Sequence, residues 1–280
     1  MHAIFKMKWN IGKEGHHMII DFHIHTFPDA LAERAVKKLS QTAGIPSYTD
    51  GTVSDTLAKM KQWKVDKGVF LNIATKPSQQ RTINDRCLSM KDPRIIPFGS
   101  VHIDSEDCLE ELVRVKKLGM KGIKLHPDYQ GFFIDDPRAY PVYQQCADLG
   151  LIVVIHAGTD PVSPGVIHAE PKAIARVLER FPRLTLVAAH FGGTDCWDDV
   201  LRYLVGKQVY LDTALSAGNI PAEKALQIIR AHGAHRILFG SDCPWHSSAM
   251  DLAFIRSLGL REEEEAMIFS ENACALLNRE

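Results

Sequence analysis

The sequence predicts a (β/α)8 TIM barrel of the α/β class, and three observations lead to this prediction. The chain has 280 residues, close to the ~250 that are typical of this fold. Short apolar runs alternate with helical patterns, which indicates parallel strands joined by right-handed crossovers. The pattern repeats eight times, and eight strand–helix pairs favour a closed barrel over an open, doubly wound sheet.

The expected strands are short runs rich in aliphatic residues. Two of them, Val69–Leu71 and Leu151–Ile155, are apolar without interruption, as is typical of strands buried on both faces. The eight strands are expected over residues 18–23, 68–73, 94–100, 121–125, 151–155, 184–189, 208–212 and 236–240.

Helical patterns fill the intervals between these runs. Gly119 and Gly150 stand where helices end and a left-handed residue is needed, while Pro137 and Pro171 suit the first turn of a helix. Helices are expected over residues 29–42, 53–64, 78–91, 106–118, 137–149, 170–180, 196–205 and 221–232, with two or three extra C-terminal helices between 248 and 278. The loops 43–52 and 157–169 are placed where they could border the barrel mouth.

The chain is expected to form one domain over residues 18–280, because no repeat, low-complexity segment or linker interrupts the pattern. Met18 opens the first convincing strand. Residues 1–17 are therefore expected to be an N-terminal extension, either an alternative start or a short hairpin.

The composition is that of an ordinary soluble globular protein, with 45% hydrophobic and 24% charged residues. A formal net charge of −1 gives no reason to expect a nucleic acid or an acidic membrane as a partner. No apolar run approaches the ~20 residues that span a bilayer, and the first seventeen residues do not read as a secretory signal. The six cysteines are widely spaced, which favours reduced thiols and a cytoplasmic location.

Two histidines close the first expected strand, in Asp21-Phe22-His23-Ile24-His25. Side chains two residues apart in a strand point to the same face, so both imidazoles project side by side. Paired neutral imidazoles are a common way to bind a metal ion. Taken alone, two such histidines are as compatible with surface or core positions as with a metal site. Their assignment as metal ligands therefore depends on finding further ligands.

Three more strand ends carry chemically active side chains, namely His156, His190 and Asp242. Because barrel active sites lie at the carboxyl ends of the strands, these side chains are expected to meet His23 and His25. His156 follows an aliphatic run, where an unpaired imidazole is costly to bury, which favours a metal partner. His190 is expected to be an acid-base residue, or alternatively a second ligand. Asp242 either caps the next helix or, as we prefer, has a functional role.

Lys124 and His126 share one face of the fourth expected strand, in Gly122-Ile123-Lys124-Leu125-His126-Pro127. His126 either lines a substrate pocket or hydrogen-bonds the loop backbone. Lys124 has three alternative roles, since it could bind a substrate anion, become a carbamylated metal bridge or form a buried ion pair. Both residues are candidates for substrate binding.

Aromatic side chains also gather near the expected barrel mouth. Each one alone is more readily explained by core packing, but together they indicate a partly apolar pocket for a ring or a planar acid. The aromatic candidates are Phe27, Tyr129, Phe132, Trp197 and Trp245. Weaker cationic candidates for an anionic substrate are Lys76, Arg81 and Arg138, whose directions the sequence does not fix.

The strand-end motifs together resemble the amidohydrolase superfamily. The resemblance rests on Asp21–His25, Gly122–Pro127, His156-Ala157-Gly158, Ala189–Gly193 and Leu238–Trp245. It points to the branch of metal-dependent TIM-barrel hydrolases that also contains aminocarboxymuconate-semialdehyde and resorcylate-type decarboxylases. It extends from about residue 18 to the C-terminus and does not specify a substrate.

The resemblance implies that His23, His25, His156 and Asp242 bind one divalent metal ion, with His190 as the acid-base residue and Asp242 in a second, catalytic role. Zinc is the metal that this nitrogen and oxygen donor set suits best, and manganese or iron are alternatives. Relatives bind small molecules and are often dimers, so a homodimer is compatible with the resemblance.

Three functions remain open at this point. The first is a metal-dependent hydrolase that cleaves a C–O or C–N bond of a small carboxylate, lactone, ester or amide with metal-activated water. The second is a non-oxidative, metal-dependent decarboxylase of an aromatic or unsaturated acid. The third is a catalytically silent binding barrel, which the complete ligand set argues against. Fold and ligands alone do not separate the first two reactions.

Overall fold

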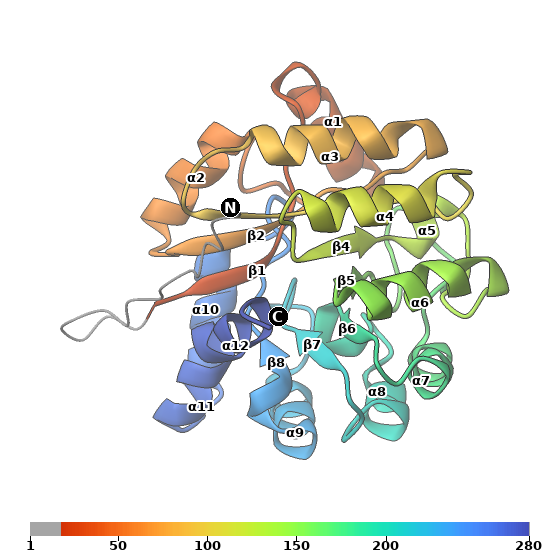
Figure 1. The fold of residues 1–280 in the computed structure, drawn as a ribbon. Helices are drawn as coiled ribbons and strands as arrows, with labels where there is room; N and C mark the ends of the chain where they lie inside the picture. Colours follow the sequence, from red (N-terminus) through yellow and green to blue (C-terminus); the bar gives the residue numbers. More distant parts are fainter. Residues whose placement is uncertain (1–17, 280) are drawn as a thin grey trace.

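In the computed structural model, which describes residues 18–279, the chain forms a (β/α)8 barrel with its helices outside a central ring of parallel strands (Figure 1). The predicted fold class is therefore confirmed. The predicted N-terminal extension, residues 1–17, lies outside the described residues.

The eight strands fall within two residues of the predicted runs. Their bounds are β1 Ile20–Ile24, β2 Lys67–Leu71, β3 Ile95–Phe98, β4 Gly122–Leu125, β5 Ile152–Ile155, β6 Thr185–Ala188, β7 Tyr210–Asp212 and β8 Ile237–Leu238. Every paired strand runs parallel to its neighbour, as strands linked by crossover helices must.

The barrel is closed at two seams where the regular ladder gives way to single bridges. Strands β1–β2–β3 and β4 to β8 form two ladders. The first seam joins Gly99 to Ile123, and the second joins Ile24 to Cys243. At the second seam the His25 backbone N–H donates to the Cys243 carbonyl oxygen at 2.6 Å. Residues near the two ends of the described chain thus lie side by side.

The helices follow the predicted order and cover the outside of the barrel. Their bounds are α1 Asp29–Ala43, α2 Val53–Gln62, α3 Gln80–Ser89, α4 Cys108–Lys117, α6 Tyr140–Leu149, α7 Pro171–Arg180, α8 Trp197–Tyr203, α9 Ala222–His232, α10 Ser248–Ser257, α11 Glu262–Ala266 and α12 Asn272–Leu277. The one-turn helix α5, Pro127–Gln130, directly follows β4 and was not part of the predicted pattern.

Two apolar layers hold the barrel together. The inner layer contains alternate strand residues such as Phe22, Val69 and Val154, and it includes Leu276 of α12. The outer layer, with residues such as Val153, packs the strands against the surrounding helices. Side chains of a strand alternate between its two faces, so each strand contributes to both layers.

An irregularity in β1 turns its histidines toward the barrel mouth. The pairing register of β1 with β2 shifts between Asp21 and Ile24. Such a shift bends a strand and re-aims the side chains that follow it. Phe22 belongs to the inner layer, whereas His23 and His25 line the cavity described below.

None of the helices within residues 18–279 combines the length and the apolar character needed to cross a membrane.

We expect Leu112→Ala to lower the free energy of unfolding by about 2–5 kcal/mol, because Leu112 on α4 is fully buried in the outer layer. Leu118→Ala at the end of the same helix is the matched control, since Leu118 is 41% exposed. It should change stability by less than about 1 kcal/mol. Urea unfolding measures both values, and equal losses would contradict the placement of α4.

Candidate metal centre and active-site cavity

A cavity of about 690 Å³ opens at the carboxyl ends of the strands. Its floor contains most of the polar residues singled out in the sequence, and its walls are mostly apolar. The floor residues are His23, His25, Lys124, His126, His156, His190 and Asp242. The structure thus brings together side chains that the sequence scatters over more than two hundred positions.

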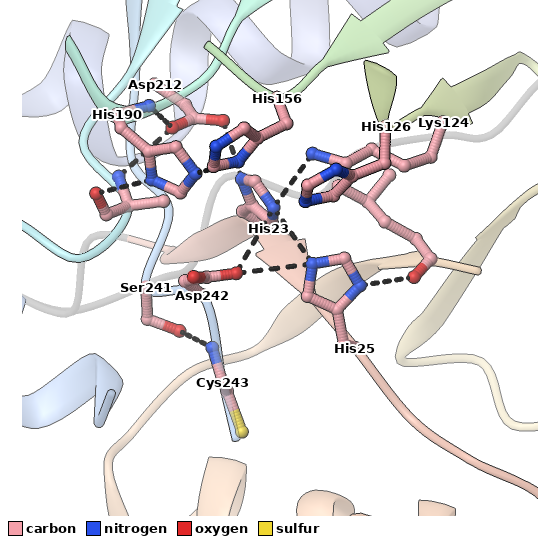
Figure 2. Close-up of polar contacts among 12 residues, drawn as sticks. His23, His25, Lys124, His126, His156, His190, Asp212, Ser241, Asp242 and Cys243 are labelled. Atoms are coloured by element: carbon pink, nitrogen blue, oxygen red, sulfur yellow. Dashed lines mark hydrogen bonds and ion pairs between the residues drawn. The ribbon is translucent and has the colours of Figure 1, made fainter. Parts of the chain in front are cut away.

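Three of the predicted ligands converge on one another. The Nε2 atoms of His23 and His25 lie 3.1 Å apart, and Oδ1 of Asp242 lies 3.4 Å and 3.2 Å from them. All three ligand atoms fall within 4.8 Å of one another, in buried positions. Figure 2 shows them facing a common point.

Their hydrogen bonds fix the protonation that a metal ligand needs. Nδ1 of His25 lies 2.6 Å from the Leu71 carbonyl oxygen, which can only accept. Nδ1 of His23 lies 2.8 Å from a carboxylate oxygen of Asp212. Both Nδ1 atoms therefore carry hydrogen. Burial, with the nearby Lys124 ammonium, holds the pKa of His23 well below its usual value, so its ring is neutral.

With hydrogen on Nδ1, the neutral form of each ring presents an Nε2 lone pair to the other ring and to the Asp242 carboxylate. Burial alone would raise the pKa of Asp242, and it is the positive charge that the facing His23 and His25 rings gain on protonation that lowers it below its usual range. Lone pairs that converge in a buried space repel unless a cation lies between them. The residues present therefore fit a divalent metal ion.

Asp212, at the end of β7, supports this arrangement and was missed in the sequence analysis. One carboxylate oxygen accepts from His23 Nδ1, and the other accepts from the backbone N–H groups of His190 and Ala214 at 2.9 and 3.1 Å. A carboxylate behind a ligating imidazole fixes its tautomer and orientation. Its place as the last residue of an expected strand was the signal that could have identified it.

Asp21 is a second buried carboxyl group behind the site. Its Oδ1 accepts from the backbone N–H groups of His23 and Ser241, both at 3.0 Å, and its Oδ2 accepts from the Ser248 hydroxyl at 2.7 Å. Burial raises the pKa of Asp21 to about 7. The group ties β1 to the loop that carries Asp242.

His156, the fourth predicted ligand, does not belong to the converging group of three. Its Nδ1 lies 3.1 Å from Nε2 of His190, and its Nε2 lies 3.3 Å from the Thr159 carbonyl oxygen. His190 in turn places Nδ1 3.1 Å from the Ala214 carbonyl oxygen. The two imidazoles are therefore side by side at the cavity floor, and the ligand role of His156 stays a prediction.

A second group of metal-binding type combines His126, His156 and Asp160. The ring of His126 is stacked between Tyr129 and His156, with centroid distances of 3.7 and 4.2 Å. Its Nε2 lies 3.5 Å from Asp160 Oδ2, while its buried Nδ1 has no hydrogen-bond partner. Of the two alternatives for His126, the pocket position is the one observed. Asp160, in the loop after β5, was not foreseen.

Lys124 is completely buried, and its Nζ lies 3.2 Å from His23 Nε2. Burial lowers the pKa of Lys124 to about 8, although the carboxylates of Asp212, Asp242 and Asp160 oppose this effect. The structure places Lys124 at the cavity floor, and each of its three predicted roles stays a prediction.

The aromatic candidates divide into two groups. Phe27, Tyr129 and Trp245 line the cavity, and the rings of Phe27 and Trp245 meet edge to face at 6.3 Å. The placement of Trp197 in the substrate pocket was wrong, because this residue begins α8 and packs against the outer apolar layer instead. Phe132 is likewise buried in that layer. Apolar character alone did not distinguish wall residues from core residues.

Backbone strain accompanies two of the floor residues. His190 and Asp242 have φ values of 58° and 66°, in the left-handed region that non-glycine residues rarely adopt. Such strain persists only where surrounding contacts hold it, and it is common at functional sites. Here the Asp212 carboxylate holds the His190 backbone N–H, and the His23 carbonyl accepts from the Asp242 backbone N–H at 2.9 Å.

Comparisons with known proteins agree with this geometry. A family model described as amidohydrolase matches residues 20–279. Among curated proteins, 2-amino-3-carboxymuconate-6-semialdehyde decarboxylase of Dictyostelium discoideum is 30% identical over 125 residues, which cover 38% of this chain and 35% of that protein. The chain thus aligns with about a third of the length of this relative.

Solved structures match over nearly the whole chain. The 5-carboxyvanillate decarboxylase LigW from Sphingomonas paucimobilis has a TM-score of 0.72 at 16% identity, covering 95% of this chain and 100% of that one. A "probable 2-pyrone-4,6-dicarboxylic acid hydrolase" from Acinetobacter baumannii has a TM-score of 0.66 at 18% identity, covering 93% and 99%. At these identities the likeness establishes the barrel fold.

The family model spans almost all of the described residues, and the converging histidines and aspartate supply the donors that a metal-dependent enzyme requires. As the sequence motifs implied, the protein belongs to the amidohydrolase family of metal-dependent enzymes.

Proposed function

We propose that the protein is a metal-dependent decarboxylase that releases carbon dioxide from a small, largely apolar carboxylic acid without an oxidant. The observation that carries this proposal is the convergence of His23, His25 and Asp242 at the floor of a cavity with apolar walls. The curated relative that is a decarboxylase supports it. The sequence alone ranked hydrolysis first and decarboxylation second, and we reverse that ranking.

The cavity walls favour the loss of a carboxylate. Aliphatic side chains from α1, the loop after it and α3 form one side, including Leu39, Ala43, Ile45 and Ile83. A carboxylate is poorly stabilised in apolar surroundings. Decarboxylation replaces its localised charge by neutral carbon dioxide and by charge that spreads over the rest of the substrate, so these walls favour the products.

His23, His25 and Asp242 would hold the metal ion, and we retain His156 as the proposed fourth ligand. Zinc suits this set of imidazole and carboxylate donors, with manganese or iron as alternatives. Bound there, a divalent ion supplies a Lewis acid that orients the substrate oxygens and stabilises negative charge on them. Asp212 keeps the His23 lone pair directed at the same point.

We assign the proton transfer to His190. When the carbon–carbon bond breaks, its electron pair stays on the substrate carbon, and a proton must take the place of carbon dioxide. His190 Nδ1 is engaged with the Ala214 carbonyl oxygen, so Nε2, which faces His156 Nδ1 at 3.1 Å, is the atom that would deliver the proton. Water then restores the proton to His190, so the balance is one carboxylate anion and one proton converted to product and carbon dioxide.

The substrate body would rest against the residues above this floor. Phe27, Tyr129 and Trp245 offer flat apolar surfaces, and the buried His126 ring, stacked on Tyr129, adjoins them at the floor. Lys124 places a positive charge beside the proposed ligands, where it would attract an acid group. Together these residues suit a planar or ring-containing carboxylic acid.

Hydrolysis of a C–O or C–N bond is the second candidate, and the ionised carboxylate of Asp242 favours it. Because Asp242 lies beside both imidazoles, it is placed to accept a proton from an attacking water while His190 protonates the leaving group. Hydrolysis consumes water and releases no carbon dioxide, so one measurement separates the two reactions.

We expect the purified, untreated protein to contain about one equivalent of zinc or manganese per chain by elemental analysis. Loaded with that metal, it should release carbon dioxide from at least one member of a panel of hydroxybenzoic and unsaturated carboxylic acids. Hydrolysis of lactones or activated esters with no carbon dioxide release from the acid panel would establish the second candidate instead. A protein that takes up no metal would contradict both.

The variants His156→Ala and His190→Ala should separate metal binding from proton transfer. We expect His156→Ala to lose metal and turnover together. His190→Ala should keep most of its metal while turnover falls by about 10²–10⁴-fold, the usual contribution of an acid-base group. Normal metal content in His156→Ala would exclude it as a ligand, and loss of a full equivalent in His190→Ala would make that residue one.

Asp212→Asn should weaken metal binding by about 10–100-fold, because the amide no longer offers a charged acceptor to His23 Nδ1. Asp128→Asn is the matched control, since the Asp128 side chain is also fully buried but pairs with His168 and, at 3.8 Å, with His126 rather than with His23 or His25. Competition with a fluorescent zinc chelator measures both affinities. Equal affinity in the two variants would show that the Asp212 carboxylate does not support the ligand.

A further inference from the structure

Helix α1 turns an apolar face toward the active-site cavity. Leu31, Leu39 and Ala43 line the cavity, and they share one broad face of the helix with Ala32 and Val36, which are buried. Leu31 is 44% exposed although its side chain is large and aliphatic. Part of this helix face is therefore packed against the protein, and the rest is open to the cavity.

Three isoleucines extend this apolar surface from other segments of the chain. Ile45 comes from the loop after α1, Ile73 from the loop after β2 and Ile83 from α3, and each is half-buried and lines the cavity. Figure 1 shows α1 and α3 at the same edge of the barrel. We call this part of the cavity the aliphatic compartment, lined by Leu31, Leu39, Ala43, Ile45, Ile73 and Ile83.

The aliphatic compartment is separate from the polar floor. The floor side chains lie at the carboxyl ends of strands, whereas the aliphatic compartment is built mainly by helices α1 and α3 and the loops beside them. Since the helices of this fold surround the strands, the cavity extends from the barrel axis outward to the compartment. A molecule held by its acid group at the floor can therefore reach the compartment with its other end.

The chemistry of the compartment favours a hydrocarbon group. None of the six side chains that define it has a polar atom, so water beside them gains no hydrogen bonds from them. A hydrocarbon group that displaces this water is stabilised roughly in proportion to the apolar area that it covers.

The cavity is also larger than a simple ring acid requires. Its volume of about 690 Å³ falls within the ~300–1,000 Å³ of pockets that enclose drug-sized molecules. A single ring with one carboxyl group is smaller than such molecules. With its acid group at the floor and its ring beside Phe27, Tyr129 and Trp245, it would leave the aliphatic compartment unfilled.

We propose that the aliphatic compartment binds an alkyl tail of the substrate, so that the natural substrate is a carboxylic acid whose planar head carries a hydrocarbon chain. This inference rests on the proposed function, because it assumes that the acid group lies at the converging donors of the floor. Binding energy from a tail that takes no part in the reaction can hold the head in its reactive orientation.

The test lengthens the tail of a ring acid one methylene at a time. Zinc-loaded protein is titrated by calorimetry with benzoate and with two series of alkylbenzoates, from methyl to hexyl, substituted at the meta or the para position. In at least one series we expect the affinity to rise about three- to fourfold for each methylene that enters the compartment.

The variant Ala43→Phe should remove most of this gain, because the larger side chain occupies space in the compartment. Ala30→Phe is the matched control and should keep the full gain, since Ala30 lies on the same helix but is exposed and outside the cavity lining. The zinc content of each variant reports whether it is folded.

Ile45→Asn provides a second variant if Ala43→Phe does not fold. It places an amide in the compartment, and an alkyl chain that covers this amide would remove it from water. The gain in affinity for each methylene should therefore be smaller than in the wild-type protein.

Two outcomes would overturn the inference and leave the proposed function standing. In one, wild-type protein binds every alkylbenzoate no more tightly than benzoate. In the other, affinity rises with chain length equally in the wild type, Ala43→Phe and Ile45→Asn, as expected if the tail packs elsewhere. Failure of the zinc-loaded protein to bind benzoate or any alkylbenzoate would overturn the proposed function and this inference together.

Discussion

The closure of the barrel between β1 and β8 is the constraint on which the site depends. Of the three converging donors, His23 and His25 lie on one side of this seam and Asp242 lies on the other, so their convergence exists only where the seam is correctly formed. The Asp242 backbone N–H donates to the His23 carbonyl oxygen, and the buried Asp21 carboxyl group accepts from both sides. These bonds fix the spacing of the ligands without using the atoms that face the cavity.

Behind the ligands lies a layer of acceptors that decides which atoms remain free. Asp212 accepts a hydrogen bond from Nδ1 of His23, and the Leu71 carbonyl oxygen accepts one from Nδ1 of His25. The Nε2 atom of each ring remains available. Lys124 adds a positive charge to the same floor. The cavity therefore has a floor of polar side chains with defined protonation states and walls that are mostly apolar. An acid group can bind at the floor while the carbon skeleton of the same molecule packs against the walls.

The sequence predicted the barrel, its eight strands and the floor residues well, because strand periodicity and strand-end position follow from local pattern. It did not reveal Asp212 or Asp160, whose importance depends on which atoms they meet across the barrel. Trp197 was misplaced for a related reason, since an aromatic residue near a strand end can turn either to the mouth or to the outer layer. Side-chain direction beyond the strands is decided by tertiary packing, which a single sequence does not display.

The position of the ligands along the chain has a consequence for biosynthesis. His23 and His25 are made with the first strand of the barrel, whereas Asp242 lies on the loop that follows the final strand. A nascent chain can therefore fold most of its strand–helix units before it possesses the complete donor set. With the proposed ligands, capture of a metal ion would have to follow synthesis of the last strand, and it would mark chains whose first and last strands have met.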